Sequence, residues 1–167
     1  MGKIGLFYGS SSGKTRRVAE MISSQFAGEV EIRDIAGAKP EDLLAYDALI
    51  LGASTEYEGD VQDDWDTFIF KHSPLDFGGR RVALFGLGDQ KRYPDEFLDG
   101  LMALYRWVKD MNGQVVGDWP AKDFNFIKSQ ALRDGRLVGL GIDEDNQKNL
   151  TGARVAEWVR MLRTQLS

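Results

Sequence analysis

The chain of 167 residues contains no cysteine and only one histidine, His72. The lack of cysteine excludes disulfides, thiol nucleophiles, zinc–thiolate sites and iron–sulfur clusters. The single histidine excludes an HExxH zinc site and any three-histidine metal site, and it disfavours hydrolase chemistry. If electrons move in this protein, a bound organic cofactor has to carry them.

Long hydrophobic runs are also missing. The longest, residues 48–53, has the length of a strand, whereas a membrane helix needs about 18 apolar residues. The first residues lack the apolar core of a signal peptide, so we expect a cytoplasmic protein without membrane insertion.

Positive charge is in deficit, because 26 acidic residues face 21 Lys and Arg and leave a net charge of -5. A nucleic-acid partner is disfavoured, since neutralising phosphates requires a basic surface. A basic protein partner is compatible with this charge. The length and the 43% hydrophobic content fit a single domain over residues 1–167, which we expect to be a monomer.

Short β-rich runs alternate with amphipathic stretches, which is the pattern of an α/β fold with a doubly wound parallel sheet. A helix is expected after Gly13, another at Pro40, another opening at Pro94, and a last one capped by Thr151. The expected strands are residues 3–8, 30–34, 48–53 and 82–86, and a fifth split between 115–116 and 137–142.

Ligands of such sheets bind beyond the carboxyl ends of the strands, so function is expected in the loops 9–15, 54–60, 87–93 and 143–146. The first loop, Gly9-Ser10-Ser11-Ser12-Gly13-Lys14-Thr15, offers glycines, hydroxyls and the N–H groups of a helix start. Three residues separate its glycines, where a nucleotide-hydrolysing P-loop has four. The loop therefore suits a phosphate monoester. A Ser/Gly turn that only caps a helix is the alternative.

Three segments together resemble the long-chain flavodoxins over essentially the whole chain. They are the pattern Ser10-x-Ser12-Gly13-x-Thr15, the run 84–90 followed by Tyr93, and the stretch 123–147. The resemblance implies a flavodoxin-like three-layer sandwich, with a five-stranded parallel sheet of order 2-1-3-4-5 and helices on both faces. It also implies an insertion at about 117–136 that interrupts the fifth strand.

The resemblance further implies a low-potential one-electron carrier that binds FMN non-covalently, and neither a catalytic residue nor a metal. Tyr93 is expected to lie flat against the flavin ring. Backbone groups of residues 55–59 and 87–89 are expected to bond the polar edge of the ring. The implied cofactor-binding residues are Ser10, Ser11, Ser12, Gly13, Lys14, Thr15, Ser54, Thr55, Glu56, Tyr57, Glu58, Gly59, Leu87, Gly88, Asp89, Tyr93 and Asp145.

The sequence departs from the family after Thr55. Many long-chain members have a tryptophan over the inner face of the flavin, whereas this chain has Glu56 followed by Tyr57. Either Tyr57 or the aliphatic part of Glu56 could cover that face. In flavodoxins the peptide after the position of Tyr57 turns over on reduction, which Gly or Asn tolerates better than Tyr. Lys14 is read as solvated rather than as a phosphate clamp.

Residues 54–70 carry six acids and no Lys or Arg. With residues 143–145 they are expected to flank the flavin edge, to disfavour the anionic reduced flavin and to steer a basic partner. A ferredoxin–NADP reductase, a pyruvate oxidoreductase, nitrogenase or a photosystem would each match. A solvated acidic face is the plainer reading.

Two other classes of protein remain to be weighed. An FMN-dependent NAD(P)H:quinone or flavin reductase is the alternative function, although no second nucleotide site is visible in the sequence. A receiver domain is excluded, because Gly9-Ser10 and Ser54-Thr55 stand where it needs acids.

Overall fold

A computed structural model describes residues 2–167, and Met1 lies outside the described residues. Its main sheet is parallel and runs in the order β2-β1-β3-β4, after which β5 and β9 both pair with β4. The order 2-1-3-4-5 is thus confirmed. The strands are β1 (Ile4–Tyr8), β2 (Val30–Asp34), β3 (Ala48–Ser54), β4 (Arg81–Leu87), β5 (Gln114–Val116) and β9 (Leu140–Ile142).

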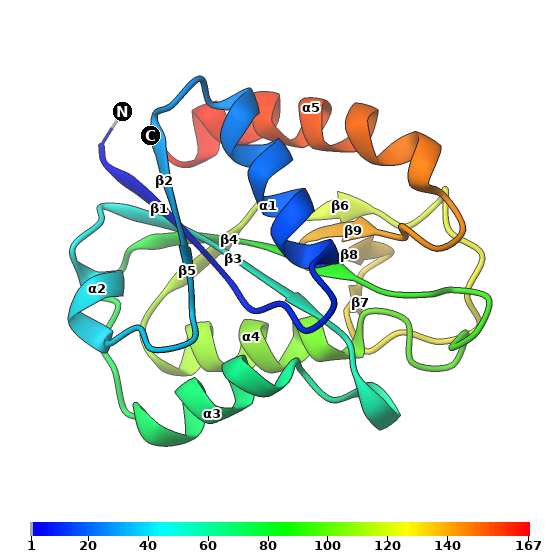
Figure 1. Ribbon diagram of the computed structural model, residues 1–167, viewed down its shortest axis with the longest axis horizontal. Coiled ribbons are helices and arrows are strands. Elements are labelled where there is room, and N and C mark those ends of the chain that lie inside the picture. Colours follow the sequence, from blue (N-terminus) through cyan, green and yellow to red (C-terminus); the bar gives the residue numbers. More distant parts are fainter. Residues whose placement is uncertain (1) are drawn as a thin grey trace.

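Helices cover both faces of this sheet, as Figure 1 shows. Helices α1 (Lys14–Gln25) and α5 (Lys148–Gln165) lie together on one face, and α3 (Asp63–Lys71) and α4 (Asp99–Asp110) lie on the other. The short α2 (Pro40–Leu44) connects β2 to β3. No helix within residues 2–167 has the length and apolar character needed to cross a membrane.

The central strands are buried on both faces, as parallel strands between helical layers are. Every residue of β1 is buried, and so are the first six residues of β3 and the last six of β4. The four tryptophans are buried as well. Trp65 in α3 packs inward and donates its indole N–H to the Gly52 carbonyl oxygen at 2.8 Å. It therefore belongs to the core.

The fifth strand is split by an insertion that forms its own small sheet. Strands β6 (Trp119–Pro120), β8 (Arg136–Leu137) and β7 (Leu132–Arg133) pair antiparallel in that order. Because Leu137 is paired with Trp119 and Leu132, the second half of the fifth strand begins at Leu140 and not at 137. The split itself is as expected from the sequence.

Helix α4 begins later than its sequence signal indicates, and helix α5 begins earlier. Helix α4 starts at Asp99 and not at Pro94, because Leu98 takes a left-handed conformation with φ of 61°. The carbonyl of Pro94 instead accepts hydrogen bonds from the N–H groups of Ile127 and Lys128, at 2.8 and 2.9 Å. Helix α5 starts at Lys148, so Thr151 lies inside its first turn and is not its cap.

Candidate functional site

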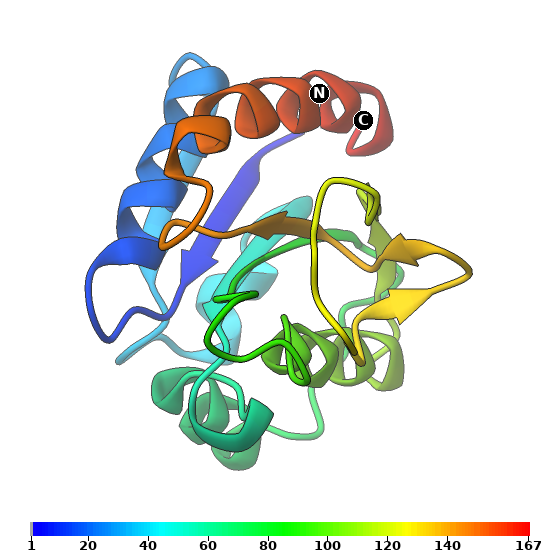
Figure 2. The same ribbon diagram turned by 90° about the vertical axis from the view of Figure 1, so that its right-hand side faces the viewer.

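The carboxyl ends of β1, β3, β4 and β9 meet at one edge of the sheet, which faces the viewer in Figure 2. The loops that follow these strands enclose a cleft of about 230 Å³. This is the edge where doubly wound sheets bind ligands. The cleft is lined by Ser11, Ser12, Lys14, Thr15, Ser54, Thr55, Glu56, Leu87, Gly88, Asp89, Arg92, Tyr93, Glu144 and Asp145.

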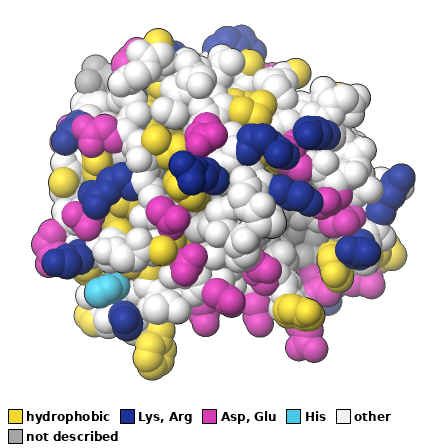
Figure 3. Space-filling view, in the orientation of Figure 1, with side chains coloured by type: hydrophobic (Ala, Val, Ile, Leu, Met, Phe, Trp, Pro, Cys, Tyr) yellow, Lys and Arg dark blue, Asp and Glu magenta, His cyan; other side chains and the backbone are white. Residues whose placement is uncertain are grey.

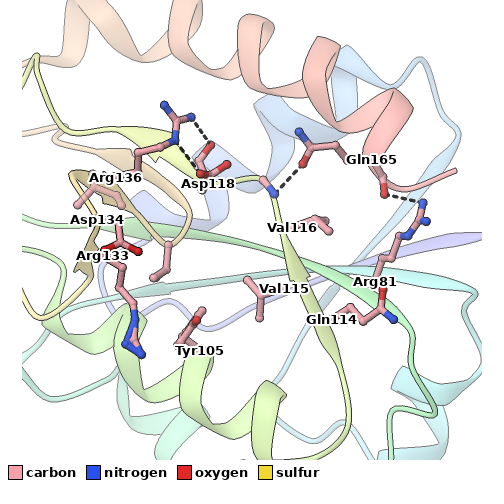
Figure 4. A pocket seen from close by; sticks show the side chains of 13 residues that line it. Arg81, Tyr105, Gln114, Val115, Val116, Asp118, Arg133, Asp134, Arg136 and Gln165 are labelled. Atoms are coloured by element: carbon pink, nitrogen blue, oxygen red, sulfur yellow. Dashed lines mark hydrogen bonds and ion pairs between the residues drawn. The ribbon is translucent and has the colours of Figure 1, made fainter.

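A larger cavity, of about 670 Å³, lies beside β5 and the β7–β8 hairpin (Figure 4). Two of its arginines, Arg81 and Arg136, are hydrogen-bonded within the protein, and Arg133 lies over the ring of Tyr105. Arg136 donates from Nε to Asp118 Oδ2 at 2.7 Å, and Arg81 donates to the carbonyl oxygen of Gln165 at 3.1 Å. This cavity has no Ser or Thr in its lining, so the smaller cleft is the better candidate for an anionic ligand.

The loop after β1 is shaped to expose the start of α1. Gly13 has a φ of 89°, which favours glycine, and its N–H donates to Ser10 Oγ at 3.0 Å. No side chain caps α1, so its first N–H groups are free to bind an anion. A Cβ on Gly9 would lie 2.1 Å from Gln62 Oε1, so only glycine fits there.

Two side chains of the first turn of α1 lie in the cleft. Thr15 is buried in the protein and contributes to the lining. Lys14, read from the sequence as solvated, is half exposed and places its Nζ 2.5 Å from Asp145 Oδ1. This ion pair joins the loop after β1 to the loop after β9.

Two acids that were expected on an exposed docking surface are buried instead. Asp143 accepts hydrogen bonds from the Gln90 N–H at 3.1 Å and from Gln90 Nε2 at 2.7 Å. Glu144 accepts from Thr151 Oγ1 at 2.6 Å and is ion-paired with Arg17. Both carboxylates brace the loop, because buried charges need partners. Asp145 alone of the three is exposed.

The pKa of Glu144 is shifted by these contacts. Burial raises it, but the hydrogen bonds from Thr151 and Arg17 and the charge of Arg17 outweigh burial and hold the pKa below its usual value. Glu144 is therefore held as a carboxylate beside the cleft.

The loop after β3 is a tight turn, η1 (Tyr57–Gly59), in which Glu58 and Gly59 have φ of 54° and 82°. Thr55 Oγ1 accepts from the N–H of Gly100 at 3.0 Å, which ties the loop to α4. Glu56 lines the cleft, whereas Tyr57 is 90% exposed and is not part of the lining. The structure therefore brings Glu56 into the cleft and leaves residues 57–59 outside its lining.

The loop after β4 carries Tyr93, which is 52% exposed and lines the cleft. Asp89 organises this loop: its Oδ1 accepts from the N–H groups of Lys91 and Arg92 and from Asn146 Nδ2 at 2.8 Å. Burial raises the pKa of Asp89, but these bonds outweigh burial and lower it. The aromatic ring is thus presented by a braced loop.

The insertion packs against the same loop. The N–H of Asn125 donates to Gln90 Oε1 at 2.5 Å, and the N–H groups of Ile127 and Lys128 both reach the carbonyl of Pro94. The buried Gln90 therefore joins three segments: its own loop, the insertion and Asp143.

Sequence reasoning missed several residues of this site. Arg92 and Glu144 line the cleft without having been assigned to it. Gln62 and Gln90 are buried next to the cleft and hydrogen-bond to Ser11 and Asp143. Gln90 follows the Gly88-Asp89 pair of a predicted site loop, which is a usable signal, whereas nothing in the sequence around Gln62 marks it.

Comparisons with known proteins agree with the fold. The flavodoxin family model matches residues 6–158. Flavodoxin from Synechococcus elongatus is 43% identical over 167 residues, which cover 99% of this chain and 98% of the relative. Flavodoxin 1 from Escherichia coli K12 is 42% identical over 164 residues, which cover 97% and 93%. A crystal structure of Fusobacterium nucleatum flavodoxin bound to flavin mononucleotide is similar with a TM-score of 0.95, at 26% identity over all of both chains.

The groups in the cleft suit a ligand of that kind. FMN combines a phosphate, a polar chain and a planar ring, and the cleft offers the uncapped start of α1, several hydroxyls and the half-exposed ring of Tyr93. The parallel sheet order, the lining of the cleft and the extent of the sequence match lead to one conclusion: the chain belongs to the flavodoxin family.

Proposed function

We propose that this protein binds FMN non-covalently and carries single electrons between redox proteins. The observation that carries the proposal is the cleft, in which the uncapped start of α1 and the ring of Tyr93 are brought together by loops 80 residues apart in sequence. The family match and the FMN-bound relative from F. nucleatum support it. When bound, FMN supplies the redox chemistry.

The residues around the cleft take three tasks in this proposal. The N–H groups and hydroxyls of residues 10–15 hold the phosphate, since a helix start favours an anion. Tyr93 covers one face of the ring, and the stem of Glu56 lies on the inner side. Backbone groups of the lining residues 55–56 and 87–89 bond the polar edge of the ring.

The acids near the cleft affect the reduction potential of the bound flavin and the choice of redox partner. Glu58, Asp60, Asp63 and Asp66 are exposed around the turn after β3 and the start of α3, and acidic side chains gather along the lower part of the view in Figure 3. This field disfavours extra negative charge on the flavin, which lowers its second reduction potential. It also attracts a basic redox partner, of the kind a ferredoxin–NADP reductase or a photosystem offers.

An FMN-dependent reductase is the competing function. It needs a second nucleotide site, whereas two of the three arginines that line the larger cavity, Arg81 and Arg136, are already hydrogen-bonded within the protein. The named relatives are flavodoxins. NADPH oxidation by the purified protein alone would favour the reductase.

The direct test is a visible absorption spectrum of the protein purified without added cofactor, followed by identification of the chromophore released on heating. We expect two flavin bands and FMN. A colourless protein that also fails to take up added FMN would contradict the proposal.

Thr15 gives a residue-level test. Thr15→Val keeps the shape but removes a hydroxyl, so FMN binding should weaken by about 1.5–3 kcal/mol if that hydroxyl donates to the phosphate. Thr67→Val, on the exposed side of α3, is the matched control. Equal FMN affinities of the two variants in a calorimetric titration would remove Thr15 from the phosphate site.

A further inference from the structure

Glu56 places a negative charge among the hydroxyls of the cleft. Its Oε1 accepts a hydrogen bond from Ser11 Oγ at 2.9 Å and another from Ser54 Oγ at 3.2 Å. Ser11 belongs to the loop that precedes α1, 45 positions earlier in the chain. Glu56 therefore reaches back from the turn after β3 into the anion-binding loop.

The hydroxyl of Ser11 is held in one orientation. Gln62 Nε2 donates to Ser11 Oγ at 3.3 Å. The Gln62 amide is itself fixed, because it is buried and its Oε1 accepts from the N–H groups of Asp64 and Trp65 at 3.1 and 3.4 Å. A serine hydroxyl has one hydrogen to donate. With Gln62 donating to it, Ser11 directs that hydrogen at Glu56.

A phosphate bound in the same loop needs the same kind of donor. If Ser11 gives its hydrogen to Glu56, it cannot give it to a phosphate oxygen, and a carboxylate close to a phosphate also repels it. Lys14, the cation of this loop, does not offset this charge, since it is paired with Asp145. The contact between Ser11 and Glu56 thus weakens the binding of a phosphate but not the binding of an uncharged ring.

We propose that Glu56 competes with the FMN phosphate for the hydroxyl of Ser11. This competition reduces the preference of the site for FMN over flavins without a phosphate. The inference rests on the proposed function for its ligand and assigns a specificity-determining role to one residue. The neighbouring acid Asp60 is exposed and accepts the Glu56 N–H through its backbone carbonyl at 2.7 Å, a contact that Asp60→Asn keeps, so this variant is a matched control of equal charge.

The test compares wild type, Glu56→Gln and Asp60→Asn, each stripped of flavin. FMN and riboflavin are titrated by fluorescence, and the ratio of the two dissociation constants is the readout. Glu56→Gln should raise the preference for FMN over riboflavin by about tenfold, the effect of one charge-assisted hydrogen bond. Asp60→Asn should change the ratio by less than about twofold. Glu56→Ala replaces Glu56→Gln if that variant fails to fold.

Inorganic phosphate gives a second readout that needs no flavin. Its binding, followed by the amide chemical shifts of residues 10–15, should be tighter in Glu56→Gln than in wild type. An unchanged or lowered FMN preference overturns the inference, whatever the absolute affinities. A wild type that binds neither flavin contradicts the proposed function, and the phosphate measurement then decides the role of Glu56 by itself.

Discussion

Two tyrosines flank the cleft and differ in their surroundings. Tyr93 lines it and is presented by a loop that Asp89, Gln90 and the insertion hold in place. Tyr57 projects from the turn after β3 and is almost fully exposed. Stacking on a ring requires a side chain that is already near it, so the two should contribute unequally.

Tyr93→Ala should weaken FMN binding by about 1–3 kcal/mol, the scale of stacking between an aromatic side chain and a nucleobase. Tyr57→Ala should cost less, because its ring lies outside the lining. Quenching of FMN fluorescence on binding measures both. A larger loss for Tyr57→Ala would mean that Tyr57 turns inward and covers the inner face.

At the scale of elements, four strands and the starts of α1 and α2 were predicted correctly, whereas the starts of α4 and α5 were not. Four expected strands agree with β1 to β4 within one residue at each end, because buried parallel strands are nearly continuous apolar runs. Pro94 and Thr151 have the chemistry of helix starts, but tertiary contacts decide otherwise. The insertion binds the carbonyl of Pro94, and Glu144 takes the hydroxyl of Thr151.

The lining of the cleft was predictable only in part. The Ser/Gly loop and Tyr93 could be recognised, since turns that expose a helix start have a sequence signature. The direction of a side chain could not, as Glu56 and Tyr57 illustrate: adjacent residues point into the cleft and into solvent. The burial of Asp143 and Glu144 was also unpredictable, because their partners Gln90 and Arg17 are distant in sequence.

Gln90 connects the loop after β4 to the insertion, so its loss should loosen both. Gln90→Ala should lower the free energy of unfolding by about 1–3 kcal/mol, since it leaves a buried carboxylate, Asp143, with fewer donors. Amide hydrogen exchange of Asn125, Ile127 and Lys128 should become faster. Gln25→Ala, at an exposed position in the last turn of α1 and far from the insertion in sequence, is the control. Equal exchange in both variants would show that the insertion is held without Gln90.

Glu144 makes stability depend on pH. Its folded-state pKa lies below the usual value of 4.5, so the unfolded chain binds more protons in this range. The stabilisation is present above the unfolded-state pKa and is lost as pH falls through the folded-state pKa. In Glu144→Gln, the free energy of unfolding should therefore decrease less than in wild type as the pH falls from about 5 to 3.

Urea unfolding at a series of pH values measures this effect. Glu157→Gln, at an exposed position of α5, serves as the control. If the free energy of unfolding depends on pH in Glu144→Gln as it does in wild type, other carboxylates cause the acid sensitivity.

At the scale of the whole molecule, the charge is uneven. The net charge is -5, and exposed acids cluster at the turn after β3 and the start of α3. Opposite charges speed up the first encounter of two proteins, and salt screens them over about 10 Å at 0.1 M. Electron exchange with a basic partner should therefore slow as salt is added.

The double variant Asp60→Asn/Asp63→Asn should lower the second-order rate with a ferredoxin–NADP reductase about fivefold at low salt and flatten its salt dependence. Asp110→Asn/Glu157→Gln removes the same charge from the end of α4 and from α5. Stopped-flow kinetics at several ionic strengths compare the two. Equal rates would indicate that net charge, and not its placement, governs the encounter.

The two ends of the main sheet, β2 and β5, affect how the protein behaves when it is concentrated. Strand β2 carries Glu31, Arg33 and Asp34 as exposed side chains, and β5 has only three residues, with the arginines of the insertion beside it. Charge and shortness make an edge a poor template for a strand of another molecule. Both strands are therefore poor templates for edge-to-edge aggregation, which favours a dispersed protein in concentrated solution.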